Sequence, residues 1–378
     1  MGSVREAQEP IREADLQRWR LMGRFQEVLS EKALAWDKGT WGDPRRRLEL
    51  GNYLGLYLFG LFNPVVTTMR GLCAASRLGR VQAEICGRAV SLGSFSEAQA
   101  VVAPELLEAV FAELRPSAPA AREQPTLVID STVWRVLPRM TWAFWRAGRG
   151  EDNAIRMHVQ FDLQRRSVAA VEVTRAKVCE RAQWRKWAQP GSCYIGDRYY
   201  SYDYDLLGQL QARGVDFLVR LRLDAQWVQE QEQRLTASDR AAGVTWAGLV
   251  QLGVQGDGPR VRVIQIMGED ESILLATTLA AEVAPPEVLA QTYKHRWQVE
   301  LFFRWFKCIL GCRHWLAESP RGVALQVYLA LIAAQLLLLY TGQRPTKRQM
   351  EAIQFYQLGW ASAEELVARV SPPAPKKS

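Results

Sequence analysis

The sequence predicts a mixed α/β fold, in which helices cover a sheet that is interrupted by a β-rich insertion and preceded by a helical region. Residues 126–222 follow the order strand, strand, strand, helix, strand, helix, strand. Residues 223–284 add strand-like runs, whereas residues 51–112 have a helical pattern. A hairpin followed by alternating strands and helices is typical of a mixed sheet with helices on both faces. A length of 378 residues suits several domains.

The N-terminal part of the chain is predicted to be helical. It is apolar, rich in small residues and poor in strand-like alternation. Ser94 and Ser96 are candidate helix caps, and Pro104 is placed to open the next helix. The Pro- and Ala-rich residues 114–126 predict a linker. We therefore assign residues 1–116 to a helical N-terminal region.

The sheet is predicted to begin after this linker. Two short apolar runs, 126–130 and 192–197, each end in an aspartate. Residues 154–163 alternate with a period of two, and 168–175 follow a turn-like stretch, which predicts a hairpin. The remaining elements are helices at 179–189 and 204–214 and a strand at 215–222. Residues 117–222 thus form the predicted first part of the core.

The second half of the chain changes character twice. Residues 223–284 carry three strand-like runs separated by Gly, Asp and Pro, and we assign them to a β-rich insertion. After Pro285 and Pro286 the pattern is helical, so 285–345 is the predicted second part of the core. Residues 346–378 form a C-terminal segment whose basic, Pro-rich tail is predicted to be disordered.

Charge points to a polyanionic partner. The chain has 48 Lys and Arg against 40 Asp and Glu, a net charge of +8, and its pI is near 9.3. Such a surplus is typical of nucleic-acid binding, although many basic proteins bind none. Arg45–Arg47 is the densest basic cluster and is either a solvated run or a phosphate contact. No P-loop or GxGxxG motif occurs, so no nucleotide cofactor is predicted.

One segment is long enough to cross a membrane. Residues 322–341 are apolar over about the 20 positions that a span needs, but Gln326 and Gln335 interrupt them. We predict a buried core helix, with a membrane span as the alternative. The charged N-terminus has no apolar signal region. The sequence therefore predicts a cytoplasmic chain that does not enter a membrane.

A polar stripe marks the helical stretch from Pro286 to Leu310. At 100° per residue, five polar residues fall within about 80° of the helix surface, whereas most of the remaining surface is apolar or aromatic. They are Tyr293, Arg296, Glu300, Arg304 and Lys307. Buried polar groups are costly without partners. The stripe is therefore either a structural ion-pair network or a functional site.

Two aspartates favour the functional interpretation. Asp130 and Asp197 each end a predicted strand, where ligands of α/β sheets gather. Either one alone is more typically a turn or helix cap. Together with Glu300 they offer three hard oxygen donors, and the chain has only three His. Such donors suit Mg²⁺ or Mn²⁺, and two such ions about 4 Å apart promote in-line displacement at phosphorus. Neighbouring Arg and Lys would hold phosphates.

The motifs TLVIDST and CYIGDRYY and the spacing Tyr293-x2-Arg296-x3-Glu300-x6-Lys307 together resemble bacterial DDE transposases of the insertion-sequence-4 family. The resemblance covers roughly residues 50–345. It implies an RNase H-like core with a β insertion between the second Asp and the Glu. Glu300 follows Asp197 by 103 positions, which leaves room for that insertion.

This resemblance implies a site and a reaction. Asp130, Asp197 and Glu300 would be the triad that binds two Mg²⁺ or Mn²⁺ ions. Tyr293, Arg296 and Lys307 would contact DNA phosphates, and Arg304 shares their stripe. The implied reaction nicks double-stranded DNA at the terminal inverted repeats, forms and reopens a hairpin, and joins the 3′-OH to target DNA. The resemblance also implies a homodimer on paired ends, residues 1–116 as the DNA-binding region, and association with the bacterial nucleoid.

Other features leave alternatives open. Trp134, Trp227 and Trp246 are candidates for stacking on a flipped base, although a position in the core is the more usual role for any one of them. Cys308-x3-Cys312-x-His314 lacks a fourth ligand for a zinc site. A domesticated, inactive DNA-binding protein is a second hypothesis, which the intact triad disfavours. A metal nuclease without strand transfer is a third, which a joining assay separates from the first.

Overall fold

A computed structural model describes most of the chain, and its contacts divide it into two compact units. The described ranges are 28–32, 48–116, 124–137, 139–147, 150–268, 271–309, 315–341 and 346–370. The helical unit comprises residues 1–116, 137–142 and 304–378, and the sheet unit comprises 117–136 and 143–303. Arg45–Arg47, Cys312, His314 and the tail from 371 lie outside the described residues.

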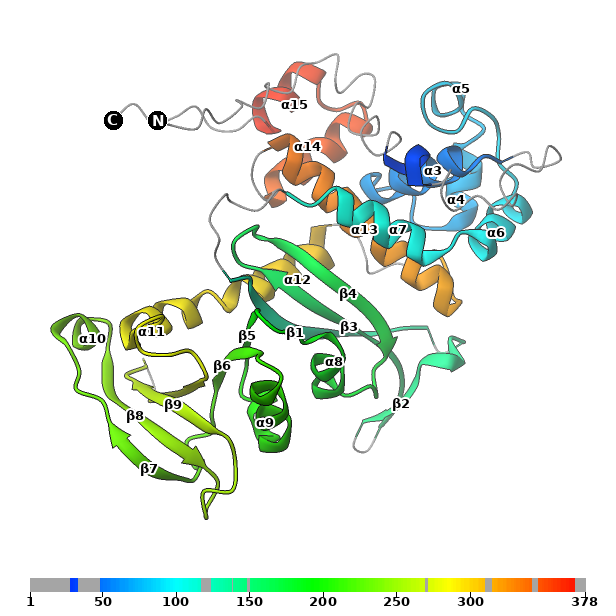
Figure 1. The fold of residues 1–378 in the computed structure, drawn as a ribbon. Helices are drawn as coiled ribbons and strands as arrows, with labels where there is room; N and C mark the ends of the chain where they lie inside the picture. The colour runs from blue at the N-terminus through cyan, green and yellow to red at the C-terminus, as the bar shows by residue number, and fades with distance from the viewer. Residues whose placement is uncertain are drawn as a thin grey trace. The chain divides into compact units, whose positions relative to one another are not determined.

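The helical unit combines helices from both ends of the chain (Figure 1). Its helices are α3 (Leu50–Phe62), α4 (Met69–Ala75), α5 (Gly79–Val81), the π-helical turn η1 (Gln82–Cys86), α6 (Leu92–Val101), α7 (Pro104–Glu113), α13 (Pro320–Thr341), α14 (Lys347–Gln357) and α15 (Ala363–Val370). Pro104 opens α7 as predicted. The expectation that Ser94 and Ser96 cap a helix was wrong. Ser91 caps α6 instead, because its side chain accepts a hydrogen bond from the amide of Ser94.

Helix α13 is the long apolar segment. By length and composition it could cross a membrane, and 78% of its most apolar window is buried within the structure. It packs against α7 and α3. The buried Gln326 is satisfied there, since its Oε1 accepts from the amide of Leu316 at 2.9 Å and from the Tyr57 hydroxyl at 3.4 Å. Gln326, one of the two glutamines that interrupt the apolar run, therefore serves packing within this unit.

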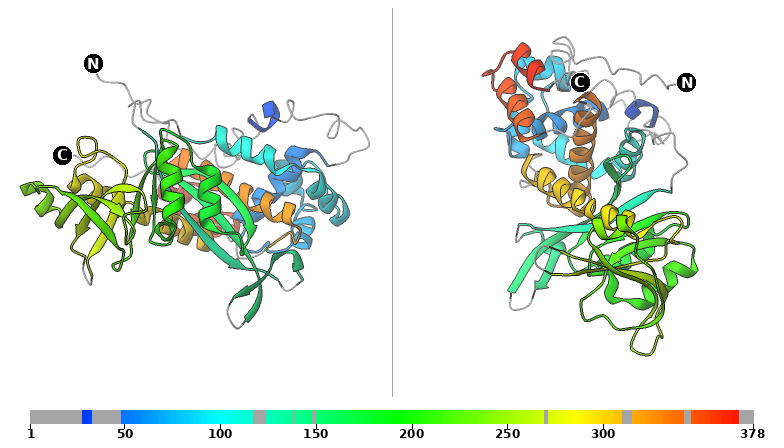
Figure 2. Two further views of the ribbon diagram at one scale, coloured as in Figure 1. Left: turned by 60° about the horizontal axis from the view of Figure 1, so that its bottom comes forward. Right: turned by 90° about the vertical axis from the view of Figure 1, so that its left-hand side faces the viewer.

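The sheet unit is built on one ten-stranded sheet. Its strands are β1 (Thr126–Arg135), β2 (Phe144–Ala147), β3 (Gly150–Asp162), β4 (Ser167–Arg175), β5 (Cys193–Gly196), β6 (Asp216–Arg220), β7 (Trp227–Glu232), β8 (Val244–Leu252), β9 (Arg260–Ile266) and β10 (Ile273–Thr277). The order is β2-β3-β1-β5-β6-β10-β9-β8-β7, with β4 paired to β3. Figure 2 shows the β2–β3 hairpin extending beyond the body of this sheet.

The core of the sheet has the strand order β4-β3-β1-β5-β6. The first three strands are antiparallel, whereas β1, β5 and β6 are parallel. This order and these directions are those of an RNase H-like sheet, so the predicted mixed α/β fold class is confirmed. The β-rich strands continue the same sheet, because β10 pairs antiparallel with β6. Helices α10 (Ala237–Ala241) and α11 (Pro286–Lys294) pack beside β8.

Alternation along β1 separates the two faces of the core sheet. Leu127 and Ile129 join a buried cluster with Trp184 of α8 (Glu180–Trp187) and Leu206 of α9 (Tyr204–Ala212). On the other face, the ring of Phe161 lies 6.0 Å from that of Phe302 in α12 (Trp297–Ile309). Within this unit the sheet therefore lies between α8 and α9 on one side and the start of α12, residues 297–303, on the other.

Candidate active site

Asp130 lies where β1 outlasts its parallel neighbour. Strand β5 pairs with β1 only from Thr126 to Val128 and ends at Gly196. The expectation that Asp130 ends a strand was wrong, because β1 continues along β3 as far as Arg135. Asp197 follows β5 directly, as predicted. Both carboxylates thus lie near the carboxyl end of β5.

The turn after β5 fixes Asp197. Its Oδ1 accepts a hydrogen bond from the amide of Tyr199 at 2.8 Å, and its carbonyl accepts from that of Tyr200 at 3.3 Å. A Cβ on Gly196 would stand 3.0 Å from the ring of Tyr200. Glycine therefore lets the buried Tyr200 ring fold back closely against the end of the strand.

The helical stretch that carries Glu300 is divided in two. The prediction of one helix from Pro286 to Leu310 was wrong, since α11 ends at Lys294 and α12 begins at Trp297. The amides of His295 and Arg296 bond three residues back, each at 3.0 Å, and so tighten the chain between the helices. Arg296 lies in this joint, and a uniform 100° count does not carry across it.

Arg296 brings two of the predicted carboxylates together. Its Nη2 lies 2.6 Å from Oε1 of Glu300, and its Nη1 lies 3.9 Å from Oδ2 of Asp130. Its guanidinium carbon stands 5.9 Å from the ring centre of Tyr293, a cation–π distance. Only 18% of the Arg296 side chain is exposed. A single arginine therefore links elements that are far apart in the sequence.

The electrostatics of this cluster raise the pKa of Asp130 to about 7. Burial is the largest cause, and the negative charges of Asp197 and Glu180 act in the same direction. The Ser131 amide, which donates to Oδ1 of Asp130 at 2.7 Å, and Arg296 act in the opposite direction. Asp197 therefore lies within electrostatic reach of Asp130.

Tyr293 belongs to the same electrostatic neighbourhood. The pKa of its hydroxyl is raised to about 12, mainly by burial; the charge of Asp197 acts in the same direction, and that of Arg296 in the opposite one. The tyrosine is therefore neutral at physiological pH, with a hydroxyl available to donate a hydrogen bond.

The oxygen donors of Asp130, Asp197 and Glu300 are of the type that a hard divalent cation prefers. In the described parts of the chain, no three His, Cys, Asp or Glu side chains are arranged as they stand to hold a metal ion. The guanidinium of Arg296 instead places a positive group between Asp130 and Glu300. Carboxylates that already face a cation, with Asp197 in electrostatic reach, suit Mg²⁺ or Mn²⁺.

The remaining stripe residues lie further along α12. Arg304 and Lys307 follow Glu300 by four and seven positions, so all three share one helix face. Arg304 is exposed, and Lys307 is partly buried. Both belong to the helical unit. The side chain of Cys308 lies outside the described residues.

The three predicted stacking tryptophans differ in accessibility. Trp134 on β1 is only 8% exposed. Trp227 and Trp246 stack on each other, with ring centres 6.2 Å apart and planes at 21°. A Cβ on Gly248 would stand 2.7 Å from the Trp246 ring, so the glycine lets that ring lie across β8. The pair is partly buried against the core cluster.

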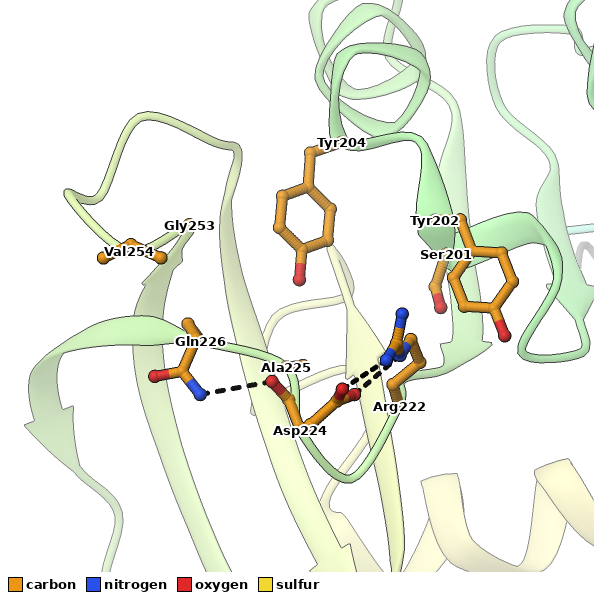
Figure 3. Close-up of a pocket in the computed structure, with 9 residues that line it drawn as sticks. All are labelled: Ser201, Tyr202, Tyr204, Arg222, Asp224, Ala225, Gln226, Gly253 and Val254. Atoms are coloured by element: carbon orange, nitrogen blue, oxygen red, sulfur yellow. Dashed lines mark hydrogen bonds and ion pairs between the residues drawn. The ribbon is translucent and has the colours of Figure 1, made fainter.

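A pocket of about 330 Å³ lies at the ends of β6 and β8 (Figure 3). Arg222 is bound by Asp224, with Nε 2.6 Å from Oδ1, and its guanidinium lies 5.5 Å from the ring centre of Tyr202. Figure 3 shows the hydroxyl of Tyr204 pointing toward the Arg222–Asp224 pair.

Sequence reasoning missed three polar residues beside Asp130. Arg156 and Glu180 form an ion pair, and both contact the hydroxyl of Ser131. The alternation of β3 placed Arg156 on one face of the strand, but no spacing connects it to a glutamate 24 positions later. The available signal was a charged residue, Arg156, in a predicted strand of mostly apolar side chains.

The chain thus combines an RNase H-like sheet with two aspartates beside the end of β5 and a glutamate on α12. The family described as Transposase DDE domain matches residues 121–336, more than half of the chain. The chain therefore belongs to the DDE transposase family.

Two individual proteins show further similarity. "Putative transposase y4zB" of Sinorhizobium fredii (strain NBRC 101917 / NGR234) is 28% identical over 217 residues, which cover 56% of this chain and 59% of that protein. The match thus spans less than two thirds of that relative. The cryo-EM structure of the piggyBac transposase synaptic complex with hairpin DNA aligns with a TM-score of 0.45 and 10% identity, over 100% of this chain and 89% of that one.

Proposed function

We propose that the chain is a DNA transposase of the insertion-sequence-4 type, which cleaves double-stranded DNA at the ends of its element and joins them to target DNA. The observation that supports this most is the meeting of Asp130 and Glu300 at Arg296, with Asp197 at the same edge of the sheet, in a member of the DDE family. Carboxylates on separate elements that converge on one partly buried positive charge are suited to hold the divalent ions that promote phosphoryl transfer.

Asp130, Asp197 and Glu300 are the residues that would hold the divalent ions. When bound, Mg²⁺ or Mn²⁺ would supply an activated nucleophile and stabilise the leaving oxygen. The chain's own contribution is orientation. The Ser131 amide holds Oδ1 of Asp130 and leaves Oδ2 turned to the site, and the Tyr199 amide holds Oδ1 of Asp197.

Arg296, Tyr293, Arg304 and Lys307 are proposed to bind the DNA backbone. Arg296 has a planar guanidinium that suits phosphate oxygens, and the neutral hydroxyl of Tyr293 can donate to one. The basic excess of the chain supports a polyanionic partner. A homodimer that pairs two terminal inverted repeats completes the proposal.

The function is tested with the purified chain, Mg²⁺ and a DNA fragment that carries both element ends. Nicks at the ends, then hairpins, then products joined to a target plasmid would support the full reaction. Cleavage without joining of pre-cleaved ends would instead support a metal nuclease. Binding without any cleavage would support the inactive DNA-binding protein.

R296Q is expected to lower the cleavage rate about 30-fold, because it removes the cation between Asp130 and Glu300 and a phosphate contact worth about 2 kcal/mol. R296K is expected to recover only part of the rate, since one ammonium cannot reproduce the planar fork. The measurement is single-turnover nicking of end DNA. R260Q, which breaks the exposed pair with Glu230, is the control. Equal rates for R296Q and R260Q would contradict the assignment.

W246A is expected to reduce hairpin formation about tenfold while nicking persists, if the Trp227–Trp246 pair stacks on a displaced base, because such stacking contributes about 1–3 kcal/mol. Fluorescence of 2-aminopurine near the DNA end would report the stacking directly. W360A, which removes an exposed ring of the helical unit, serves as the control. Unchanged hairpin yield and fluorescence in W246A would exclude this role.

A further inference from the structure

Three partly buried polar side chains lie near Asp130, namely Ser131, Arg156 and Glu180. The Arg156 and Glu180 side chains are 18% and 17% exposed, and Nη1 of Arg156 is paired with Oε1 of Glu180. Arg156 comes from β3, and Glu180 is the first residue of α8. This pair therefore joins the middle of the core sheet to the start of a helix on its α8 face.

The pair acts on one residue, Ser131. The Ser131 hydroxyl donates to Oε1 of Glu180 and accepts from Nη1 of Arg156 at 3.0 Å. Nε of Arg156 also donates to the carbonyl of Ala176 at 3.2 Å, so the guanidinium is held from two directions. The single proton of the serine hydroxyl is thus donated to Glu180, and one lone pair of its oxygen accepts the hydrogen bond from Arg156.

Ser131 lies where the backbone of β1 has lost a neighbour. Strand β5 pairs with β1 only as far as Val128, whereas β3 pairs with it throughout. The amide of Ser131 is therefore available to Oδ1 of Asp130, to which it donates at 2.7 Å. A strand that is held on one side needs a second anchor to keep such an amide in place, and the Ser131 hydroxyl supplies it.

We infer that Arg156 and Glu180 form a positioning pair, which fixes the orientation of Asp130 through Ser131 and so determines which carboxylate oxygen faces the reacting phosphate. With Oδ1 engaged by the amide, Oδ2 is the oxygen turned toward Arg296. The inference rests on the proposed function, in which Asp130 is a catalytic carboxylate. In this inference Arg156 and Glu180 orient Asp130 through Ser131, while the negative charge of Glu180 also raises the pKa of Asp130 directly.

The variants E180Q, R156Q and S131A test the pair. Each is expected to lower the nicking rate at saturating DNA by about tenfold or more, because partners that orient ligating groups are worth about 10- to 100-fold. The affinity for Mn²⁺, measured by electron paramagnetic resonance, should fall in parallel. The affinity for end DNA without divalent metal should stay within about twofold, since no phosphate contact is lost.

The matched control is K186Q/E172Q, which removes another ion pair between α8 and the sheet, with Lys186 Nζ 2.6 Å from Glu172 Oε2. It should leave both the rate and the Mn²⁺ affinity unchanged. E180D should recover part of the rate. The double variant R156Q/E180Q should be no slower than the slower single variant, because the two side chains act as one unit.

Rates and Mn²⁺ affinities within twofold of wild type in all three variants would overturn the inference. So would equal losses in the control, or a loss of rate that follows the unfolded fraction alone. S131A removes only one hydroxyl, so it still tests the inference if E180Q and R156Q do not fold. A wild-type chain that binds Mn²⁺ but does not nick DNA would refute the proposed function, while the Mn²⁺ affinities would still test the positioning pair.

Discussion

D130N, D197N and E300Q are each expected to lower DNA cleavage at element ends by about a thousandfold or more. Each amide keeps the shape of the side chain but loses the negative charge that would hold a divalent ion. Metal ions contribute several kcal/mol to such reactions, and about 4 kcal/mol corresponds to a thousandfold change in rate. The measurement is single-turnover nicking with Mg²⁺ and, separately, with Mn²⁺.

DNA binding by these variants is expected to persist, because removing acidic groups does not weaken contacts with phosphates. The control is D205N, an exposed aspartate in the first turn of α9 close to Asp197 in the sequence. It should cleave at the wild-type rate. A triad variant that cleaves as fast as D205N would exclude that residue from the catalytic site.

D130N is expected to make the chain more stable than wild type in metal-free buffer at pH 8, by up to about 3 kcal/mol. Burial raises the pKa of Asp130 to about 7, from an ordinary value of 3.8. Between these values the folded state binds more protons than the unfolded state, so wild-type stability falls as pH rises. Three pKa units correspond to about 4 kcal/mol, which solvent at the partly exposed carboxylate reduces. Asparagine carries no charge to be buried.

The measurement is the urea midpoint of wild type and D130N in chelator at pH 5 and pH 8. The stability gap should be about a third of its full size at pH 5, grow toward pH 7 and then level off. Adding Mn²⁺ at pH 8 should narrow it, because the ion binds only the folded wild type. A gap of constant size at both pH values, or a less stable D130N at pH 8, would mean that the negative charge of Asp130 does not destabilise the folded state.

The sequence predicted the core elements well where hydrophobicity was decisive. Strand β5 is a short apolar run, so Asp197 was placed correctly at its end. Strand β7 was missed because its residues, WVQEQE, are mostly exposed at the edge of the sheet and carry no apolar alternation. The end of β1 was misplaced because its pairing with β3, which depends on a distant segment, extends the strand past Asp130.

The residues of the candidate site could be proposed from the sequence, but their arrangement in space could not. The spacing singled out Tyr293, Arg296 and Glu300, yet neither Gly nor Pro marks the joint at residues 295–296 that places Arg296 between two carboxylates. The Arg156–Glu180 pair arises from the packing of α8 on β3, and packing between elements leaves no periodic signal in the sequence.

The central claim is that Asp130, Asp197 and Glu300 together hold divalent ions at the DNA end. The most direct measurement is a crystal structure of the chain with Mn²⁺ and element-end DNA, in which anomalous scattering locates the metal. The account predicts manganese within about 2.0–2.4 Å of oxygens from Asp130 and Asp197, with Glu300 completing the site and Arg296 moved to a DNA phosphate. Manganese bound elsewhere, or Arg296 still paired with Glu300 while DNA occupies the site, would contradict it.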